Sequence, residues 1–208
     1  MWEKRGSQKM ATQIVKEIQQ RNTRNGMKIP DEILIGRIAA LDEAAFTEIY
    51  DRYANKMLRY FYRMLKQNPE IAQDFVQDLF LKLIEKADAF NPKLKFSTWF
   101  YTLASNMVKN EYRKWKVRDL YDQEQSLHPA SFDPDLEKQL DVKAFNEELI
   151  KALDLLSPDQ KNAFILKYQE GLSLKEIGHI CRCAEGTVKS RLYYGLQKLA
   201  NKLAIYRS

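Results

Sequence analysis

Polar and charged side chains gather at the start of the helix expected after Cys183. The residues from 184 to 191 read Ala-Glu-Gly-Thr-Val-Lys-Ser-Arg. In the major groove Lys and Arg can pair with guanine and Glu can accept from cytosine, while Thr and Ser can hold phosphates. Val188 and Leu192 recur at helical spacing and are expected to face inward. The residues expected to face outward and bind duplex DNA are Glu185, Thr187, Lys189, Ser190, Arg191 and Tyr194.

A second group of side chains shares one face of a predicted helix after Pro69. Its members are Asp74, Gln77, Asp78 and Leu81, which follow one another at i, i+3, i+4 and i+7 spacing. Two carboxylates on one face suit a partner helix that carries arginines. An exposed leucine among them favours a contact surface over an ordinary solvated face.

The sequence offers no set of residues for catalysis or for a metal. It contains no HExxH motif, no phosphate-binding glycine loop and no Ser-His-Asp set, and its two histidines are His128 and His179. The only cysteines, Cys181 and Cys183, are too close together for an ordinary structural disulfide and make a poor zinc site. We therefore expect a protein that acts by binding, with no catalysis, cofactor, metal or small-molecule substrate.

The composition indicates an all-α protein. Seven glycines and six prolines among 208 residues leave few turns, and abundant Leu, Ile, Lys and Glu favour helices. No apolar run is long enough to span a bilayer or to serve as a secretion signal, which, with the cysteine usage, predicts a cytoplasmic protein without membrane insertion. The net charge of +6 suits a nucleic-acid partner but also ordinary solubility.

Two small helical domains are expected, joined by a flexible acidic linker. Residues 1–28 lack apolar periodicity and are predicted to form a disordered basic arm. Apolar residues recur every three or four positions in 29–118, the first domain, where Ser97 is expected to cap the last helix. Residues 119–142 carry seven acids, one lysine and two prolines, which is typical of a tether. The second domain spans 143–208.

The C-terminal quarter has the layout of a helix-turn-helix. Ser157-Pro-Asp-Gln160 and Ser173-Leu-Lys-Glu176 are capping boxes at two predicted helix starts. Gly178 allows two helices to cross closely, and Cys181-Arg-Cys183 forms a tight turn before the last helix. The alternative is a solvated helical hairpin in a bundle that does not bind DNA. The two boxes, the glycine and the polar start of the last helix favour DNA binding.

These motifs resemble the extracytoplasmic-function (ECF) sigma factors of the bacterial sigma-70 family. Gly171-Leu-Ser-Leu-Lys-Glu-Ile-Gly178 followed by Glu185-Gly-Thr-Val-Lys-Ser-Arg191 closely resembles region 4 of that family. Asp74-Phe-Val-Gln-Asp-Leu-Phe-Leu-Lys-Leu83 and Phe96-Ser-Thr-Trp-Phe-Tyr-Thr-Leu-Ala-Ser-Asn106 resemble the two signature helices of region 2. The resemblance implies a factor that directs RNA polymerase core to promoters, recognises the minus-35 and minus-10 elements and assists DNA melting.

The resemblance also implies a role for each group of residues. The outward residues of the last helix would read the minus-35 element, and the face that includes Asp74 and Asp78 would bind core polymerase. The acidic linker would thread toward the active-site channel of the polymerase. An anti-sigma factor is the further partner that the family suggests.

The minus-10 element would be held by the loop before residue 97 and by the helix after it. Aromatic rings and Asn amides can hold an extruded base and lysines can hold the backbone, with stacking worth roughly 1–3 kcal/mol per base. Trp99 and Phe100 are expected to support this site from the core. The candidates for base and backbone contact are Phe90, Asn91, Lys93, Lys95, Tyr101, Asn106, Lys109, Asn110 and Arg113.

Two residues depart from the family pattern. Arg182 occupies a turn position that is often glycine, and a side chain there is uncomfortable if the backbone is left-handed. Asn110 stands where region 2 often has an acidic residue, which would alter the base preference.

The main alternative function is a conventional helix-turn-helix regulator that binds duplex DNA as a dimer. Its first domain would sense a ligand or receive a phosphate. The strand alternation of a receiver domain is absent from the sequence, which favours the sigma-factor interpretation.

Overall fold

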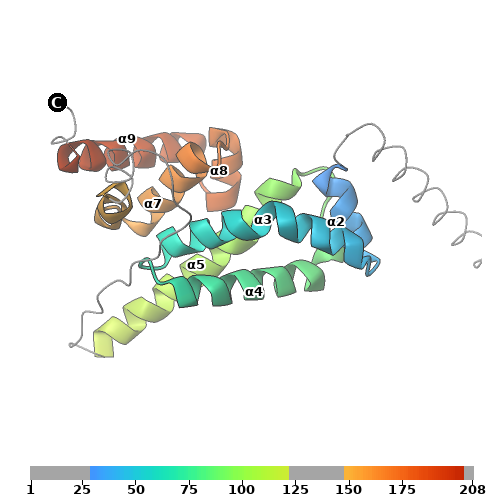
Figure 1. The fold of residues 1–208 in the computed structure, drawn as a ribbon. Helices are drawn as coiled ribbons and strands as arrows, with labels where there is room; N and C mark the ends of the chain where they lie inside the picture. The colour runs from blue at the N-terminus through green and yellow to red at the C-terminus, as the bar shows by residue number, and fades with distance from the viewer. Residues whose placement is uncertain (1–28, 122–147, 204–208) are drawn as a thin grey trace, which may run out of the picture.

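The computed structural model describes residues 29–121 and 148–203 (Figure 1). Within these two ranges the regular structure is helical and contains no strand, which confirms the expected all-α class. The predicted basic arm 1–28 and the acidic linker from residue 122 onward lie outside the described residues.

The N-terminal domain is built from four α-helices and one short 3-10 turn. Helices α3 and α4 lie side by side as an antiparallel pair, α2 crosses one end of α3, and α5 packs against all three (Figure 1). Met57, Phe61 and Phe100 are fully buried at the centre of this bundle. The bounds are α2 Asp31–Ala39, α3 Glu43–Met64, α4 Pro69–Glu85, η1 Ala87–Ala89 and α5 Phe96–Tyr121.

Side-chain caps fix where α3 and α4 begin. The Asp42 carboxylate accepts from the backbone N–H of Ala45, and the Asn68 side chain accepts from that of Ile71. Each cap satisfies an N–H group that has no partner within its helix. Pro69 occupies the first position of α4, where its missing N–H costs nothing.

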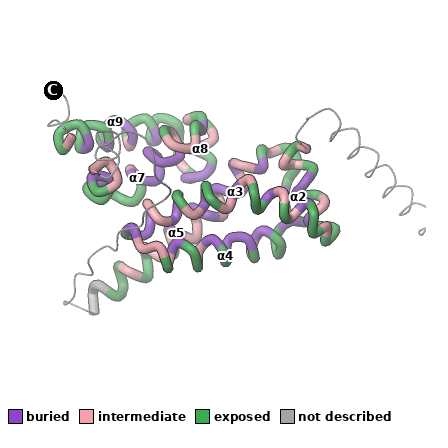
Figure 2. The backbone as a smooth tube through the Cα atoms, in the orientation of Figure 1, coloured by how far each residue is buried: buried purple, intermediate pink, exposed green. Residues whose placement is uncertain are grey.

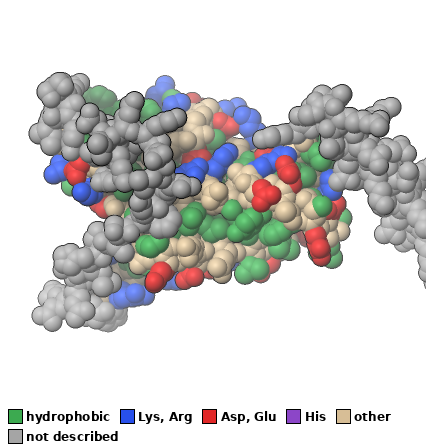
Figure 3. Space-filling model, viewed as in Figure 1, with side chains coloured by type: hydrophobic (Ala, Val, Ile, Leu, Met, Phe, Trp, Pro, Cys, Tyr) green, Lys and Arg blue, Asp and Glu red, His purple; other side chains and the backbone are tan. Residues whose placement is uncertain are grey.

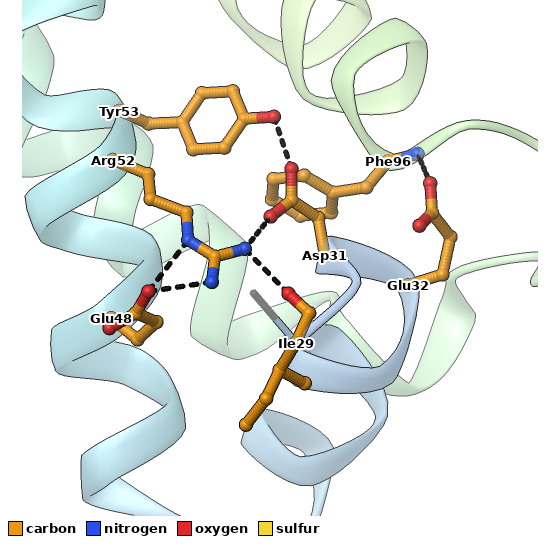
Figure 4. Close-up of polar contacts among 7 residues, drawn as sticks. All are labelled: Ile29, Asp31, Glu32, Glu48, Arg52, Tyr53 and Phe96. Atoms are coloured by element: carbon orange, nitrogen blue, oxygen red, sulfur yellow. Dashed lines mark hydrogen bonds and ion pairs between the residues drawn. The ribbon is translucent and has the colours of Figure 1, made fainter. Parts of the chain in front are cut away.

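The start of α5 is stabilised from another helix. We expected Ser97 to cap it, but the helix begins at Phe96, so Ser97 lies inside its first turn. The backbone N–H of Phe96 donates to Glu32 Oε1 of α2 at 2.9 Å (Figure 4). The prediction was wrong because a carboxylate distant in sequence takes the role that a local hydroxyl could have had.

One arginine joins α2 to α3 (Figure 4). Arg52 donates to Glu48 Oε1 at 2.6 Å, to the backbone oxygen of Ile29 at 2.7 Å and also to the Asp31 carboxylate. Tyr53 donates its hydroxyl to the other oxygen of Asp31 at 2.5 Å. All three nitrogens of the Arg52 guanidinium therefore have a partner, as a largely buried charge requires.

The C-terminal domain contains the expected helix-turn-helix. Both predicted capping boxes form, one from Ser157 and Gln160 and the other from Ser173 and Glu176. Residues 148–152 are also helical. The remaining bounds are η2 Leu153–Leu155, α7 Pro158–Phe164, its π-helical continuation η3 Ile165–Gln169, α8 Leu174–Cys181 and α9 Glu185–Lys202.

The two domains pack directly on each other. Helix α8 lies against α5 and α7 approaches α3, and buried residues lie along these contacts (Figures 1 and 2). A single hydrophobic cluster contains Met57 and Tyr101 from the first domain together with Ile165, Ile177 and Cys181 from the second. This packing decides which of the predicted site residues solvent can reach.

Candidate nucleic-acid interface

The turn between α8 and α9 has the tight geometry that its sequence predicts. A Cβ atom added to Gly178 would lie 2.8 Å from the backbone oxygen of Cys183, so no larger residue fits there without a shift. Arg182 ends α8 with φ at +55°, which is the left-handed backbone conformation that is unfavourable for a residue with a side chain. The close crossing of α8 and α9 therefore depends on the missing side chain at residue 178.

Helix α9 presents its polar residues to solvent. Val188 and Leu192 are buried against the rest of the domain, as expected. Arg191 is only half exposed, because it forms an ion pair with Asp159 at 2.5 Å and its guanidinium lies 3.4 Å from the Cys183 sulfur. The exposed members of the predicted duplex-binding set are Glu185, Thr187, Lys189, Ser190 and Tyr194.

The predicted polymerase-binding face of α4 is also open. Asp74, Gln77, Asp78 and Leu81 are all exposed, and Leu81 is 59% accessible. Hydrophobic side chains gather on the face where α3 and α4 run side by side (Figure 3).

Two further apolar residues of this region reach solvent. Tyr50 and Ile84 recur at helical spacing with buried residues of α3 and α4, yet they are 44% and 42% exposed. Periodicity alone finds the apolar stripe of a helix but not its edge, where side chains are only partly covered.

The loop before α5 divides the predicted minus-10 residues. Asn91, Lys93 and Lys95 are exposed, and the Asn91 side chain accepts from the backbone N–H of Lys93 at 3.0 Å. Phe90 is only 9% exposed and packs edge-to-face on Trp99 with ring centroids 5.4 Å apart. In this conformation Phe90 is not available to stack on a base. Phe100 lies in the core, as expected.

Along α5 the second domain covers part of the predicted set. Tyr101 is 2% exposed and donates its hydroxyl to Glu170 of the second domain. Lys109 donates to the backbone oxygen of Cys181 at 3.3 Å. Asn110 and Arg113 remain exposed and are hydrogen-bonded to each other at 3.0 Å, while Asn106 is half buried. Sequence alone could not separate these residues because the covering surface comes from the other domain.

A groove brings the two predicted DNA-binding sets together. It lies between the loop before α5 and the helix-turn-helix, and its lining includes Lys93, Lys95, Lys175, Arg182 and Glu185. Lys95 crosses the groove to bind Glu176 Oε1 at 2.8 Å. Hydrogen bonds from Lys95 and Ser173 lower the pKa of Glu176 to about 2. The carboxylate is therefore charged at neutral pH and neutralises part of the basic lining.

The part of the chain that the structure describes shows neither a metal centre nor a membrane span. No group of His, Cys, Asp or Glu residues in it is arranged to hold a metal ion. None of the helices placed in it combines the length and the apolar character needed to cross a bilayer.

Comparisons with known proteins match both domains. The family model "Sigma-70 region 2" matches residues 49–118, and "Sigma-70, region 4" matches residues 146–199. The ECF RNA polymerase sigma factor SigW of Bacillus subtilis is 34% identical over 170 residues, covering 78% of this chain and 90% of SigW. The ECF RNA polymerase sigma-E factor of Escherichia coli K12 is 27% identical, covering 85% of this chain and 95% of that factor.

Two of the solved structures that match this chain show the same fold. The sigma factor RpoE of Bartonella quintana, in complex with the anti-sigma factor NepR, has 27% identity and a TM-score of 0.66, covering 78% of this chain and 98% of RpoE. CnrH, in complex with the cytosolic domain of CnrY, has a TM-score of 0.61 over 86% of this chain and 99% of CnrH. Its identity of 20% supports the likeness of fold alone.

Two helical domains in this order, the second with a helix-turn-helix whose last helix exposes polar side chains, define a promoter-recognition factor of the sigma-70 type. The chain belongs to the family of ECF RNA polymerase sigma factors. It directs RNA polymerase to promoters in transcription initiation, as the sequence motifs predicted. A conventional dimeric regulator is therefore set aside.

Proposed function

We propose that this sigma factor uses three separate surfaces, one for core polymerase and two for promoter DNA, and that it supplies binding energy without catalysis. The observation that carries the proposal is the placement of the three predicted residue sets. They lie on α4, on α9 and on α5 with its preceding loop, and most of their members reach solvent. RNA polymerase works in the cytoplasm, and we place the chain there.

Core polymerase is assigned to α4. Asp74 and Asp78 project from this helix beside the apolar Leu81, and Gln77 lies between them in sequence. A partner helix that carries arginines and apolar residues would pair with both parts of the surface. The exposed Tyr50 and Ile84 extend the apolar part.

The minus-35 element is assigned to the first half of α9. Glu185, Thr187, Lys189 and Ser190 are exposed at the N-terminal end of a helix, which is the end that enters the major groove in helix-turn-helix proteins. Arg191 binds DNA only after its ion pair with Asp159 has broken, because one face of the guanidinium group cannot bind Asp159 and DNA at the same time. Tyr194 lies one turn further along.

The minus-10 element is assigned to the loop and to α5. Asn91, Lys93, Asn110 and Arg113 are accessible without rearrangement. Lys95, Tyr101 and Lys109 join them once the second domain has moved away, because each now contacts a residue of that domain. Asn106, which is half buried on the same helix, is assigned to this group as well. Phe90 supports the loop from beneath through Trp99, and its ring is assigned to base stacking only if the loop rearranges.

An anti-sigma factor is the expected regulator. The two solved structures described above are complexes, and in the RpoE structure the partner is an anti-sigma factor. By this likeness we assign a protein inhibitor to the present chain as well.

Run-off transcription tests the proposal. The purified chain is added to core polymerase and a library of promoter fragments, and new transcripts are mapped. We expect start sites that need both the chain and the polymerase, with shared sequence elements near minus-35 and minus-10. Binding to duplex fragments without any new start site would contradict the proposal, as would chemistry on DNA in the absence of polymerase.

A further inference from the structure

The groove between the two domains has the size of a small-molecule site. Its volume is about 1040 Å³, close to the upper end of the roughly 300–1,000 Å³ that ligand pockets occupy. One wall comes from the loop before α5 and the first turns of that helix. The other comes from α8, the turn after it and the start of α9. The two domains therefore build the groove together.

The side chains that line the groove favour an anion. Its basic residues are Lys93, Lys95, Lys175 and Arg182, and its carboxylates are Glu176 and Glu185. Glu176 already binds Lys95 with one oxygen and Ser173 with the other. Lys93, Lys175 and Arg182 make no ion pair with any described residue, so a ligand meets an excess of positive charge. The described lining includes no Phe, Tyr or Trp on which a base could stack.

A nearly buried hydroxyl group without a partner also lines the groove. Thr98 is only 6% exposed. Its backbone oxygen accepts from Thr102 at 2.7 Å, but no described residue is hydrogen-bonded to its hydroxyl. Every fully buried polar side-chain atom of the described residues has a partner, so the Thr98 hydroxyl must keep an opening, and the groove is the space beside it. A hydroxyl so placed is costly unless water or a ligand bonds to it.

The first turn of α9 adds backbone donors. Ala184 precedes this helix and no side chain caps it, whereas Ser157 and Ser173 cap α7 and α8. Ala184 and Glu185 both line the groove. Uncapped N–H groups at the start of a helix carry partial positive charge and are a common binding place for phosphate.

We propose that the groove binds an oligophosphate, which is either a free phosphate chain or the phosphate chain of a nucleotide. Ionised phosphate oxygens accept hydrogen bonds, and the groove offers ammonium, guanidinium, hydroxyl and backbone donors. Lys175 and Arg182 would neutralise the chain, and the Thr98 hydroxyl would donate to one of its oxygens. The backbone of a DNA strand could reach the lysines at the edge of the groove, but a hydroxyl that is almost buried favours a ligand small enough to enter. This inference goes beyond the proposed function, because it assigns a ligand other than DNA or polymerase.

Isothermal titration calorimetry of the full-length chain tests the proposal. The titrants are tripolyphosphate, ATP and a single-stranded oligonucleotide of mixed sequence, all in about 0.15 M salt so that diffuse attraction between exposed charges is screened. The measurement needs neither polymerase nor promoter, so its result does not depend on the proposed function.

Four positions are varied. Thr98→Val removes the hydroxyl at nearly constant volume, and Thr98→Ser restores it. Lys175→Ala and Arg182→Gly each remove a charge from the groove, and glycine suits the positive φ of residue 182. Lys116→Ala is the matched control, because it removes a lysine from an exposed position of α5 that does not line the groove.

We expect tripolyphosphate to bind the wild type at one site and Thr98→Val to weaken this binding about tenfold, because a hydrogen bond to a charged acceptor is lost. Lys175→Ala and Arg182→Gly should weaken it several-fold, while Thr98→Ser and Lys116→Ala should match the wild type. ATP that binds more tightly than tripolyphosphate, with the same dependence on Thr98, would identify the ligand as a nucleotide. Tighter binding of tripolyphosphate would identify it as the free chain.

Three results would overturn the proposal. The first is no binding of either phosphate compound at millimolar concentration. The second is an equal loss in Lys116→Ala and Lys175→Ala with no loss in Thr98→Val, which would show diffuse charge attraction only. The third is binding of the oligonucleotide alone, which would assign the groove to DNA. If circular dichroism shows that Thr98→Val has lost helical content, Lys175→Ala and Arg182→Gly decide the result against Lys116→Ala, because all three positions are exposed.

Discussion

Single residues set the shape of the DNA-reading turn. Gly178 lies so close to the backbone oxygen of Cys183 that the crossing of α8 and α9 leaves no room for a methyl group. Gly186, by contrast, has nothing within 4 Å of the position where a Cβ atom would be. Packing therefore requires glycine at residue 178 but leaves room for a side chain at residue 186.

The Gly178→Ala variant should lower the free energy of unfolding by about 1–3 kcal/mol, because a side-chain carbon would be forced against a carbonyl oxygen. Gly186→Ala is the matched control and should raise stability by about 0.5–1 kcal/mol, since alanine is the better helix former. Urea denaturation monitored by circular dichroism measures the free energy of unfolding of each variant. Equal effects of the two substitutions would contradict the packing described for the turn.

Glu176 makes the C-terminal domain sensitive to acid. Its pKa in the folded chain is about 2, against an ordinary value of 4.5, because Lys95 and Ser173 donate hydrogen bonds to the carboxylate. A carboxyl with a lowered pKa contributes stability that is fully present above pH 4.5 and is lost as pH falls toward 2. Glu176→Gln should flatten the stability profile between these values, measured by thermal unfolding at a series of pH values. An unchanged profile would show that the carboxylate is not held as described.

At the scale of helices, the three binding surfaces can be separated by mutation. Lys189→Ala with Arg191→Ala should weaken binding to the upstream promoter element and leave polymerase binding intact, because both side chains are on α9. Asp74→Arg with Asp78→Arg should do the reverse, since it inverts the charge of the α4 face. Fluorescence anisotropy with labelled promoter DNA, and co-purification with core polymerase, measure the two affinities. Loss of polymerase binding in the α9 variant would overturn the assignment of that helix.

The helices themselves could be predicted well because their signals are local. Asp42, Asn68, Ser157 and Ser173 each cap a helix through the residue three positions away, and such a spacing is visible in a sequence. The start of α5 could not be predicted in this way, because its acceptor is Glu32, which is 64 positions distant.

The same contrast between local and distant contacts explains which residues of the candidate site could be predicted from the sequence. Outward positions of α4 and α9 follow from helical periodicity, and the structure exposes nearly all of them. Tyr101 and Lys109 are polar positions on a helix and look equally free in the sequence. Their contacts with Glu170 and Cys181 arise only when the domains meet, and no spacing within α5 encodes that.

At the scale of the whole molecule, the shared core should couple the unfolding of the two domains. Calorimetry of the full chain is expected to give one cooperative transition, because one apolar cluster joins both domains and Asn162 of α7 accepts a hydrogen bond from Tyr60 of α3 and donates one to Ser105 of α5. Asn162→Ala should divide this single transition into two, because the substitution removes hydrogen bonds that couple the unfolding of one domain to that of the other. Two transitions already in the wild type would show that these contacts are too weak to couple the domains.

The tie between α2 and the rest of the first domain bears on how this domain can be isolated. The region 2 match begins at residue 49, well after Asp31 and Glu32. A fragment that began at residue 49 would lack Asp31 and Glu48, so Arg52 would lose both of its carboxylate partners. The first N–H of α5 would lose its acceptor, Glu32. The apolar surface that Leu34 and Ile38 now cover would be exposed to solvent. The smallest self-supporting piece of this half must therefore start no later than Ile29, whose carbonyl oxygen is itself one of the anchors.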